Sequence, residues 1–179
     1  MEVYVDCAHR AEEVGALPVE ELVCFVLAAE EVPAAAEVSV SFVTDEEIAR
    51  LNEEYRGKSG PTDVLSFECD GVDDDFFFGM GAEVGVDADD GVPFELGDVI
   101  IAPDVARRQT EQFGTTFESE VTLLLVHGLL HLCGYDHIAD TEAEEMEARE
   151  RELLGLWADC GHEEVRHVRD DTIRVRGEH

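Results

Sequence analysis

Alternation of apolar and polar residues along the chain predicts several short β-strands. The clearest is 38–42, where valine and phenylalanine alternate with serine, as in a strand that buries one face. Weaker alternation predicts strands over 2–7 and 63–67. A β-branched run that begins at Gly97 and ends at Ile101 predicts a central strand.

Apolar residues three and four positions apart predict helices between these strands. Five are predicted: 20–29, 44–57, 103–114, 121–133 and 141 to about 154. The fourth is apolar nearly all round, so we expect it to be buried. Three begin near a threonine and a glutamate three residues apart, the sequence of a capping box: Thr44 and Glu47, Thr115 and Glu118, and Thr141 and Glu144.

This interleaving of helices and strands predicts the α/β or α+β class, with one small mixed β-sheet covered by about five helices. No linker or repeat divides the chain, so we expect a single domain over 1–179. Residues 69–95 hold many acids and glycines but no lysine or arginine, which predicts an acidic loop insertion. Residues 156–179 are interpreted as a C-terminal extension.

The net charge of the chain bears on which kinds of partner it can bind. Its 179 residues include 44 acidic and 12 basic ones, so the formal net charge is −32, and Lys58 is the single lysine. Such a charge repels phosphate backbones and argues against a nucleic-acid partner. Because the acids are spread along the whole chain, the charge also fits solubility or adaptation to a salty interior.

The composition also bears on location. The N-terminus is acidic, and the longest apolar stretch, 121–126, is far shorter than the ~20 residues that span a bilayer. The five cysteines are scattered and form no C-x-x-C pair, which is typical of reduced, buried thiols. We therefore expect a cytoplasmic protein.

Three of the seven histidines lie within 127–137, HGLLHLCGYDH. On a helix, His127 and His131 project from one face, close enough to share a metal ion. Gly134 is suited to the left-handed conformation that ends a helix, after which His137 can supply a third ligand. Three imidazoles leave a tetrahedral zinc ion with one open position for water, whose pKa falls to about 7. The pattern predicts a catalytic site for one Zn²⁺ ion.

Other interpretations of this segment remain open. The histidines can be buried side chains that bond one another, although this is costly without a charge partner or metal. The spacing also matches H-E-x-x-H-x-x-G-x-x-H of zincin metalloproteases, but Gly128 replaces the glutamate that serves as their general base. Asp136 is either an acceptor that orients an imidazole or a turn residue. Cys133 faces another side of the helix and is interpreted as a buried thiol.

Four motifs follow one another in a fixed order: L-N-x-x-Y-R-G-K at 51–58, P-T-D-V-L-S-F at 61–67, L-G-D-V-I-I at 96–101 and VHGLLHLCGYDH at 126–137. In composition, order and spacing they resemble the YbeY family of bacterial endoribonucleases. The resemblance covers about residues 37 to 155. Several ordered motifs are far more specific than any one alone.

This resemblance implies an α/β fold with a zincin-like histidine helix, and one zinc ion held by His127, His131 and His137. It implies a metal-dependent, single-strand-specific endoribonuclease that acts in 16S ribosomal RNA 3′-end maturation and ribosome quality control. The implied partners are ribosomal RNA and the ribosome or its small subunit, with neither DNA nor a membrane. Carried over by position, Arg56 becomes a catalytic cation that binds the scissile phosphate. Taken alone, Arg56 is also a helix-end residue favoured by the dipole.

Other matching residues have simpler interpretations as well. Asp63 and Ser66 lie in the family's motif, but Asp63 can shape a strand entry and Ser66 can fill a tight inner position. We expect Asp98 to be structural. Few basic residues are candidates to line an RNA groove: Arg56, Lys58, Arg107 and Arg108. The adjacent pair Arg107 and Arg108 also fits an exposed helix face.

Two alternative functions stay open beside the endoribonuclease. The first is a ribosome-assembly or RNA-binding module in which the zinc ion is structural. The second is a zincin-like metalloprotease, which would need a general base at a position other than 128. The identity of the metal is also open, because imidazole sites accept nickel, copper and iron.

Overall fold

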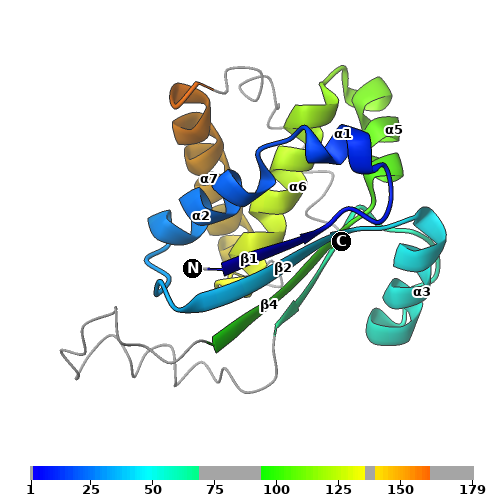
Figure 1. Ribbon diagram of the computed structural model, residues 1–179, viewed down its shortest axis with the longest axis horizontal. Coiled ribbons are helices and arrows are strands. Elements are labelled where there is room, and N and C mark those ends of the chain that lie inside the picture. The colour runs from blue at the N-terminus through cyan, green and yellow to red at the C-terminus, as the bar shows by residue number, and fades with distance from the viewer. Residues whose placement is uncertain (1, 69–93, 136–139, 162–179) are drawn as a thin grey trace.

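The computed structural model describes residues 2–68, 94–135 and 140–161, which form a mixed α+β fold (Figure 1). The fold class expected from the sequence is confirmed, with one four-stranded sheet and six helices in these residues. In chain order the elements are β1 (Glu2–Asp6), α1 (Ala11–Gly15), α2 (Val19–Ala29), β2 (Ala36–Phe42), α3 (Asp45–Arg56), β3 (Val64–Glu68), β4 (Phe94–Ile101), α5 (Pro103–Phe113), α6 (Phe117–Leu132) and α7 (Asp140–Asp159).

The strands form one sheet in the order β1-β2-β4-β3. β1, β2 and β4 run parallel, and β3 pairs antiparallel with β4. Burial alternates strictly along β2, which confirms the strand predicted over 38–42. β4 lies between two neighbours, as the β-branched run predicts, although it begins at Phe94 rather than Gly97.

Helices cover the two faces of the sheet unequally. α2, α6 and α7 contribute to one large core cluster with the inward residues of β2 and β4, among them Val40 and Val99. α3 packs on the opposite face, where Ile48 joins Leu65 of β3 in a smaller cluster. Figure 1 shows α3 apart from the bundle made by α2, α6 and α7. Every residue from Ser119 to Leu130 is buried, so α6 is the central helix that its sequence predicts.

Of the three capping boxes predicted from the sequence, one is found at the predicted residues. Thr44 caps α3, with its hydroxyl accepting from the backbone N–H of Glu47. The capping box of α6 is shifted by one residue, because Thr116 pairs reciprocally with Ser119. The predicted Thr115–Glu118 box is therefore wrong. The predicted box at Thr141 is also misplaced, since this residue lies inside α7.

The two unusual segments of the sequence are only partly described. Most of the predicted acidic insertion, 69–93, lies outside the described residues, as does 162–179 at the C-terminus. The first residues of the predicted extension continue α7 as far as Asp159, with Trp157 buried. No helix in the described part of the chain combines the length and hydropathy that a membrane span requires.

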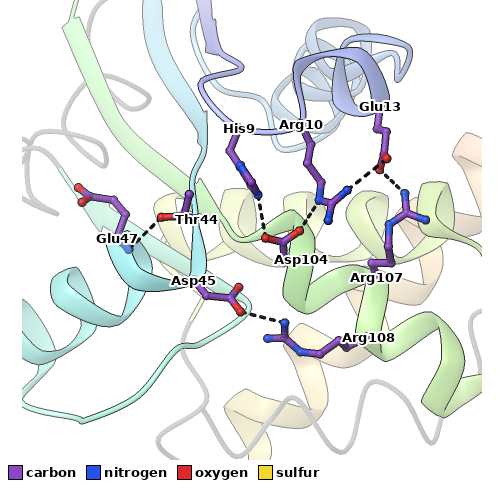
Figure 2. A network of polar contacts seen from close by, with 9 residues as sticks. All are labelled: His9, Arg10, Glu13, Thr44, Asp45, Glu47, Asp104, Arg107 and Arg108. Carbon is purple, nitrogen blue, oxygen red and sulfur yellow. Dashed lines mark hydrogen bonds and ion pairs between the residues drawn. The ribbon is translucent and has the colours of Figure 1, made fainter.

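A polar network joins the segments that follow β1 and β2 to helix α5 (Figure 2). It forms where the three parallel strands end, so it connects loops that are far apart in the sequence. Figure 2 shows arginine side chains from both sides of this contact. The pairs are His9 and Arg10 with Asp104, Arg10 and Arg107 with Glu13, and Arg108 with Asp45.

Candidate metal centre

Two of the three predicted ligands face each other in the second half of α6. The Nε2 atoms of His127 and His131 are 3.1 Å apart, and the rings meet edge-on with centroids 4.7 Å apart. Their four-residue spacing places them on one helix face, as the sequence predicts. His127 is only 9% exposed, and His131 is half-buried.

The other nitrogen of each ring faces a hydrogen-bond acceptor. Nδ1 of His127 contacts a carboxylate oxygen of Glu150, which is buried in α7. Nδ1 of His131 lies 2.9 Å from the backbone carbonyl oxygen of Tyr135. Since both acceptors require a donor, each neutral ring carries its proton on Nδ1 and keeps a lone pair on Nε2. Both lone pairs therefore point into the same space.

This arrangement fits a shared metal ion. Two facing nitrogen lone pairs cannot bond each other, whereas a cation between them satisfies both. In a tetrahedral zinc site with Zn–N bonds of about 2.0–2.1 Å, two imidazole nitrogens lie roughly 3.3 Å apart. The observed 3.1 Å is close to that value. Metal-binding histidines also donate their second N–H to a carboxylate or a carbonyl, the two acceptors found here.

The end of α6 explains why the carbonyl of Tyr135 reaches His131. Gly134 has a positive φ of 98°, the conformation that the sequence predicts for it. The N–H of Gly134 donates to the carbonyl of His131, and the N–H of Tyr135 donates to that of Leu130. These two bonds define a Schellman motif. The motif folds the chain back so that a backbone oxygen lies beside the imidazole one turn earlier.

The third predicted ligand lies outside the described residues. His137, and Asp136 beside it, belong to the segment 136–139, whose placement is not described. Within the residues that are described, no group of three or more His, Cys, Asp or Glu side chains is placed to hold a metal ion. Cys133 packs against the large core cluster, and burial, with a smaller effect of Glu30, raises its pKa to about 12. These surroundings agree with the buried thiol that the sequence predicts.

Gly128 shows why this helix differs from that of a zincin protease. A Cβ atom at this position would lie 2.7 Å from Cγ1 of Val99 and 3.1 Å from Oγ of Ser66. α6 therefore packs directly on β3 and β4 at this turn, and the Ser66 hydroxyl donates to the carbonyl of Gly128 across 3.0 Å. A side chain at 128 would point into the sheet, where no room exists for the glutamate of those proteases.

Arg56 lies at the end of α3, on the face of the sheet opposite α6. Its neighbour Tyr55 is 62% exposed and contacts Phe67 of β3, with ring centroids 5.1 Å apart. The residue before Phe67 is Ser66, which bonds to Gly128 beside the first histidine. Helix α3, which ends at Arg56, and helix α6, which carries the histidine pair, thus pack on opposite sides of one edge strand, β3.

The remaining candidates are placed mainly by structural contacts. Asp63 is buried, where its carboxylate accepts from the N–H of Val64 and from the side chain of Gln109. Asp98 pairs with Ser39 across the sheet. Burial and repulsion from Glu95 raise the pKa of Asp98, which agrees with a structural position. Lys58 is exposed, and Arg107 and Arg108 belong to the network in Figure 2, where they pair with Glu13 and Asp45.

Glu150 is the functional-site residue that sequence reasoning missed. It lies 23 residues after His127, in a helix whose composition is mostly charged. The available signal is periodicity, because Met146, Glu150, Leu153 and Trp157 are all buried and share one face of α7. A glutamate within an apolar stripe requires a partner across the interface.

Comparison with known proteins gives one consistent family. The family model described as endoribonuclease YbeY matches residues 8–158. A Bacillus licheniformis protein named endoribonuclease YbeY is 43% identical over 152 residues, which cover 82% of this chain and 91% of the relative. Proteins of the same name from Frankia alni and Bacillus subtilis are both 43% identical, with 88% and 78% of this chain covered and 83% of each relative.

A solved structure supports the same fold. The solution structure of a Thermotoga maritima protein aligns with a TM-score of 0.52, over 88% of this chain and 92% of that protein. The two sequences are 23% identical, so this similarity bears on the fold alone.

Proposed function

The chain belongs to the endoribonuclease YbeY family, and on this premise we propose that it cleaves single-stranded RNA with one zinc ion held by His127, His131 and His137. The substrate that we propose is ribosomal RNA, at the 16S 3′ end and in ribosome quality control. The proposed partner is the ribosome or its small subunit, and the proposed location is the cytoplasm.

The observation that best supports this proposal is the pair of Nε2 atoms 3.1 Å apart, each on a ring whose Nδ1 faces an acceptor. At this spacing, one metal ion can bind both Nε2 atoms. When bound, a zinc ion acts as a Lewis acid that polarises a phosphate oxygen and lowers the pKa of a coordinated water. His137 as third ligand and zinc as the metal are parts of the proposal.

The residues around the pair orient it for metal binding. In the neutral rings, Glu150 and the carbonyl of Tyr135 accept hydrogen bonds from Nδ1, which leaves the Nε2 lone pairs directed toward the space between the rings. Burial of α6 against the sheet restricts water on one side of the pair. We propose that Arg56 contacts the RNA backbone at the edge of β3, where a guanidinium can form two hydrogen bonds to one phosphate.

The test compares RNA cleavage by the wild type and by His127→Ala. We expect the variant to remain folded and its kcat/KM on single-stranded RNA to fall by more than ~100-fold. This loss is larger than the ~10-fold to 100-fold expected when a residue that only hydrogen-bonds to a metal ligand is changed. A chelator should abolish wild-type cleavage, and added zinc should restore it. Circular dichroism of both proteins provides the control for folding.

The outcomes separate the candidate functions. Cleavage that survives both the chelator and the substitution would exclude a metal-dependent nuclease. Unfolding of His127→Ala together with loss of zinc would instead support a structural metal in an RNA-binding module. Hydrolysis of casein but not of RNA would support the protease. That result would contradict the argument from Gly128, whose packing leaves no room for a glutamate at this position.

A further inference from the structure

Two adjacent residues of α7 reach the two histidines by different routes. Glu150 contacts Nδ1 of His127 directly. Arg149 acts at longer range, since Nε donates to a carboxylate oxygen of Glu30 at 2.5 Å and a terminal nitrogen donates to the carbonyl of Ala29 at 3.1 Å. Arg149 thereby holds the end of α2 in a fixed orientation.

The second route continues from Glu30 to His131. The other carboxylate oxygen of Glu30 accepts from the hydroxyl of Tyr135 at 3.2 Å. The backbone carbonyl of Tyr135 in turn accepts from Nδ1 of His131 at 2.9 Å. Tyr135 is therefore held at its side chain by α2 and at its backbone by the cap of α6.

The contacts in this route are sheltered and charge-assisted. The side chains of Glu30 and Arg149 are 10% and 23% exposed. Charge-assisted bonds in such places are stronger than exposed ones and define geometry more closely. The route joins residues more than 100 positions apart in the sequence.

From this geometry we infer that Glu30, Arg149 and Tyr135 are positioning residues for His131, as Glu150 is for His127, so that α7 orients both imidazoles toward one cation. This inference rests on the proposed metal centre. It gives α7 a role in metal affinity, in addition to its role in the core. The alternative is that Arg149 and Glu30 only join α2 to α7, with no effect on the histidines.

The experiment measures the zinc dissociation constant by competition with a chromogenic chelator. Glu150→Gln keeps the shape but weakens the acceptor, and we expect ~10-fold to 100-fold weaker zinc binding. Tyr135→Phe removes only the hydroxyl that bonds to Glu30, and Arg149→Met removes the charge. We expect each of these two to weaken binding by about 10-fold, the low end of the range for residues that support ligands.

Matched controls separate positioning from stability. Arg50→Met removes two ion pairs on the exposed face of α3, with Glu47 and Glu54, and should leave zinc affinity unchanged. Thermal unfolding of the zinc-free proteins reports the loss of stability alone. The double variant Tyr135→Phe/Arg149→Met should bind zinc about as weakly as either single variant, because both act through one route.

Each result has a defined meaning. If the wild type shows no specific zinc binding, or if both histidine-to-alanine variants bind zinc as tightly as the wild type, the metal centre itself is wrong. If the wild type binds zinc and the histidine variants do not, but Tyr135→Phe and Arg149→Met keep wild-type affinity, the positioning role is overturned. Should Arg149→Met fail to fold, Tyr135→Phe, which keeps the ring, decides the question.

Discussion

At the scale of single residues, one turn of α6 combines two requirements. His127 must face α7, where the carboxylate of Glu150 accepts a hydrogen bond from its Nδ1, while the next residue must let the helix approach the sheet. Only glycine meets the second requirement, because Gly128 lies against Val99 and Ser66. The hydrogen bond from the Ser66 hydroxyl to the backbone carbonyl of Gly128 then fixes the distance between this turn of α6 and β3.

Replacement of Gly128 by alanine tests this close approach. A Cβ atom would lie 2.7 Å from Val99 and 3.3 Å from Cγ2 of Val64, so α6 or the sheet must shift. We expect a loss of ~1–3 kcal/mol in the free energy of unfolding, as for overpacked cores. Urea denaturation followed by circular dichroism measures it.

Gly155→Ala is the matched control for this substitution. Gly155 lies in the C-terminal part of α7, and a Cβ atom there would have no neighbour within 4 Å. Because alanine is the better helix former, we expect a gain of about 0.5–1 kcal/mol. Equal effects of the two substitutions would contradict the packing argument.

At the scale of elements, the polar network of Figure 2 connects α1 and the start of α3 to α5. α1 has five residues and only one buried side chain, Val14, so packing alone attaches it weakly. Arg10 and His9 instead bind Asp104 at the first turn of α5. These ion pairs supply a tertiary contact that the apolar pattern does not.

The charge state of Asp104 should make this contact depend on pH. Burial by itself raises the pKa of Asp104, but hydrogen bonds from Arg10 and His9 outweigh it and lower the pKa below its ordinary value. A lowered carboxyl pKa stabilises the folded state above the unfolded value of about 3.9, and this stabilisation is lost as the pH falls through the folded pKa.

Asp104→Asn should therefore be less stable than the wild type at pH 7, and the difference should shrink as the pH falls through the lowered pKa of Asp104. Urea midpoints of both proteins at pH 7, 5, 4 and 3 provide the measurement. A difference of the same size at pH 7 and pH 3 would show that the charge of Asp104 contributes nothing.

At the scale of the whole molecule, the formal net charge of −32 opposes binding of the proposed RNA substrate. Two of the basic candidates in the described part of the chain, Arg107 and Arg108, are engaged in ion pairs with Glu13 and Asp45. Repulsion between an acidic protein and RNA decreases as salt screens it, with a screening length of about 10 Å at 0.1 M and 3 Å at 1 M.

We accordingly expect kcat/KM for single-stranded RNA to rise severalfold between about 0.05 and 0.5 M KCl. Steady-state cleavage of a short fluorescent RNA provides the measurement. A nuclease that binds RNA through many phosphate contacts shows the reverse, a steep loss of affinity with salt. A falling kcat/KM would thus indicate a basic groove that the described residues do not contain.

Much of the fold follows from short-range patterns in the sequence. The alternation of 38–42 is sufficient for β2, and the spacing of His127 and His131 is sufficient to place both on one helix face. Gly134 ends α6 with the positive φ that its position predicts. The capping box of α6 was misplaced because two threonines are adjacent, and only the packed helix selects Thr116 over Thr115.

The sequence by itself determined the pair of histidines, the central buried helix and the strands, because helix and strand periodicity and glycine conformation act over a few residues. Only the tertiary structure decided what lies around the pair. The partner Glu150, the route through Glu30 and the contact of Gly128 with β3 and β4 depend on which helices pack together. Those contacts join residues 23 to 120 positions apart, and no local pattern carries that information.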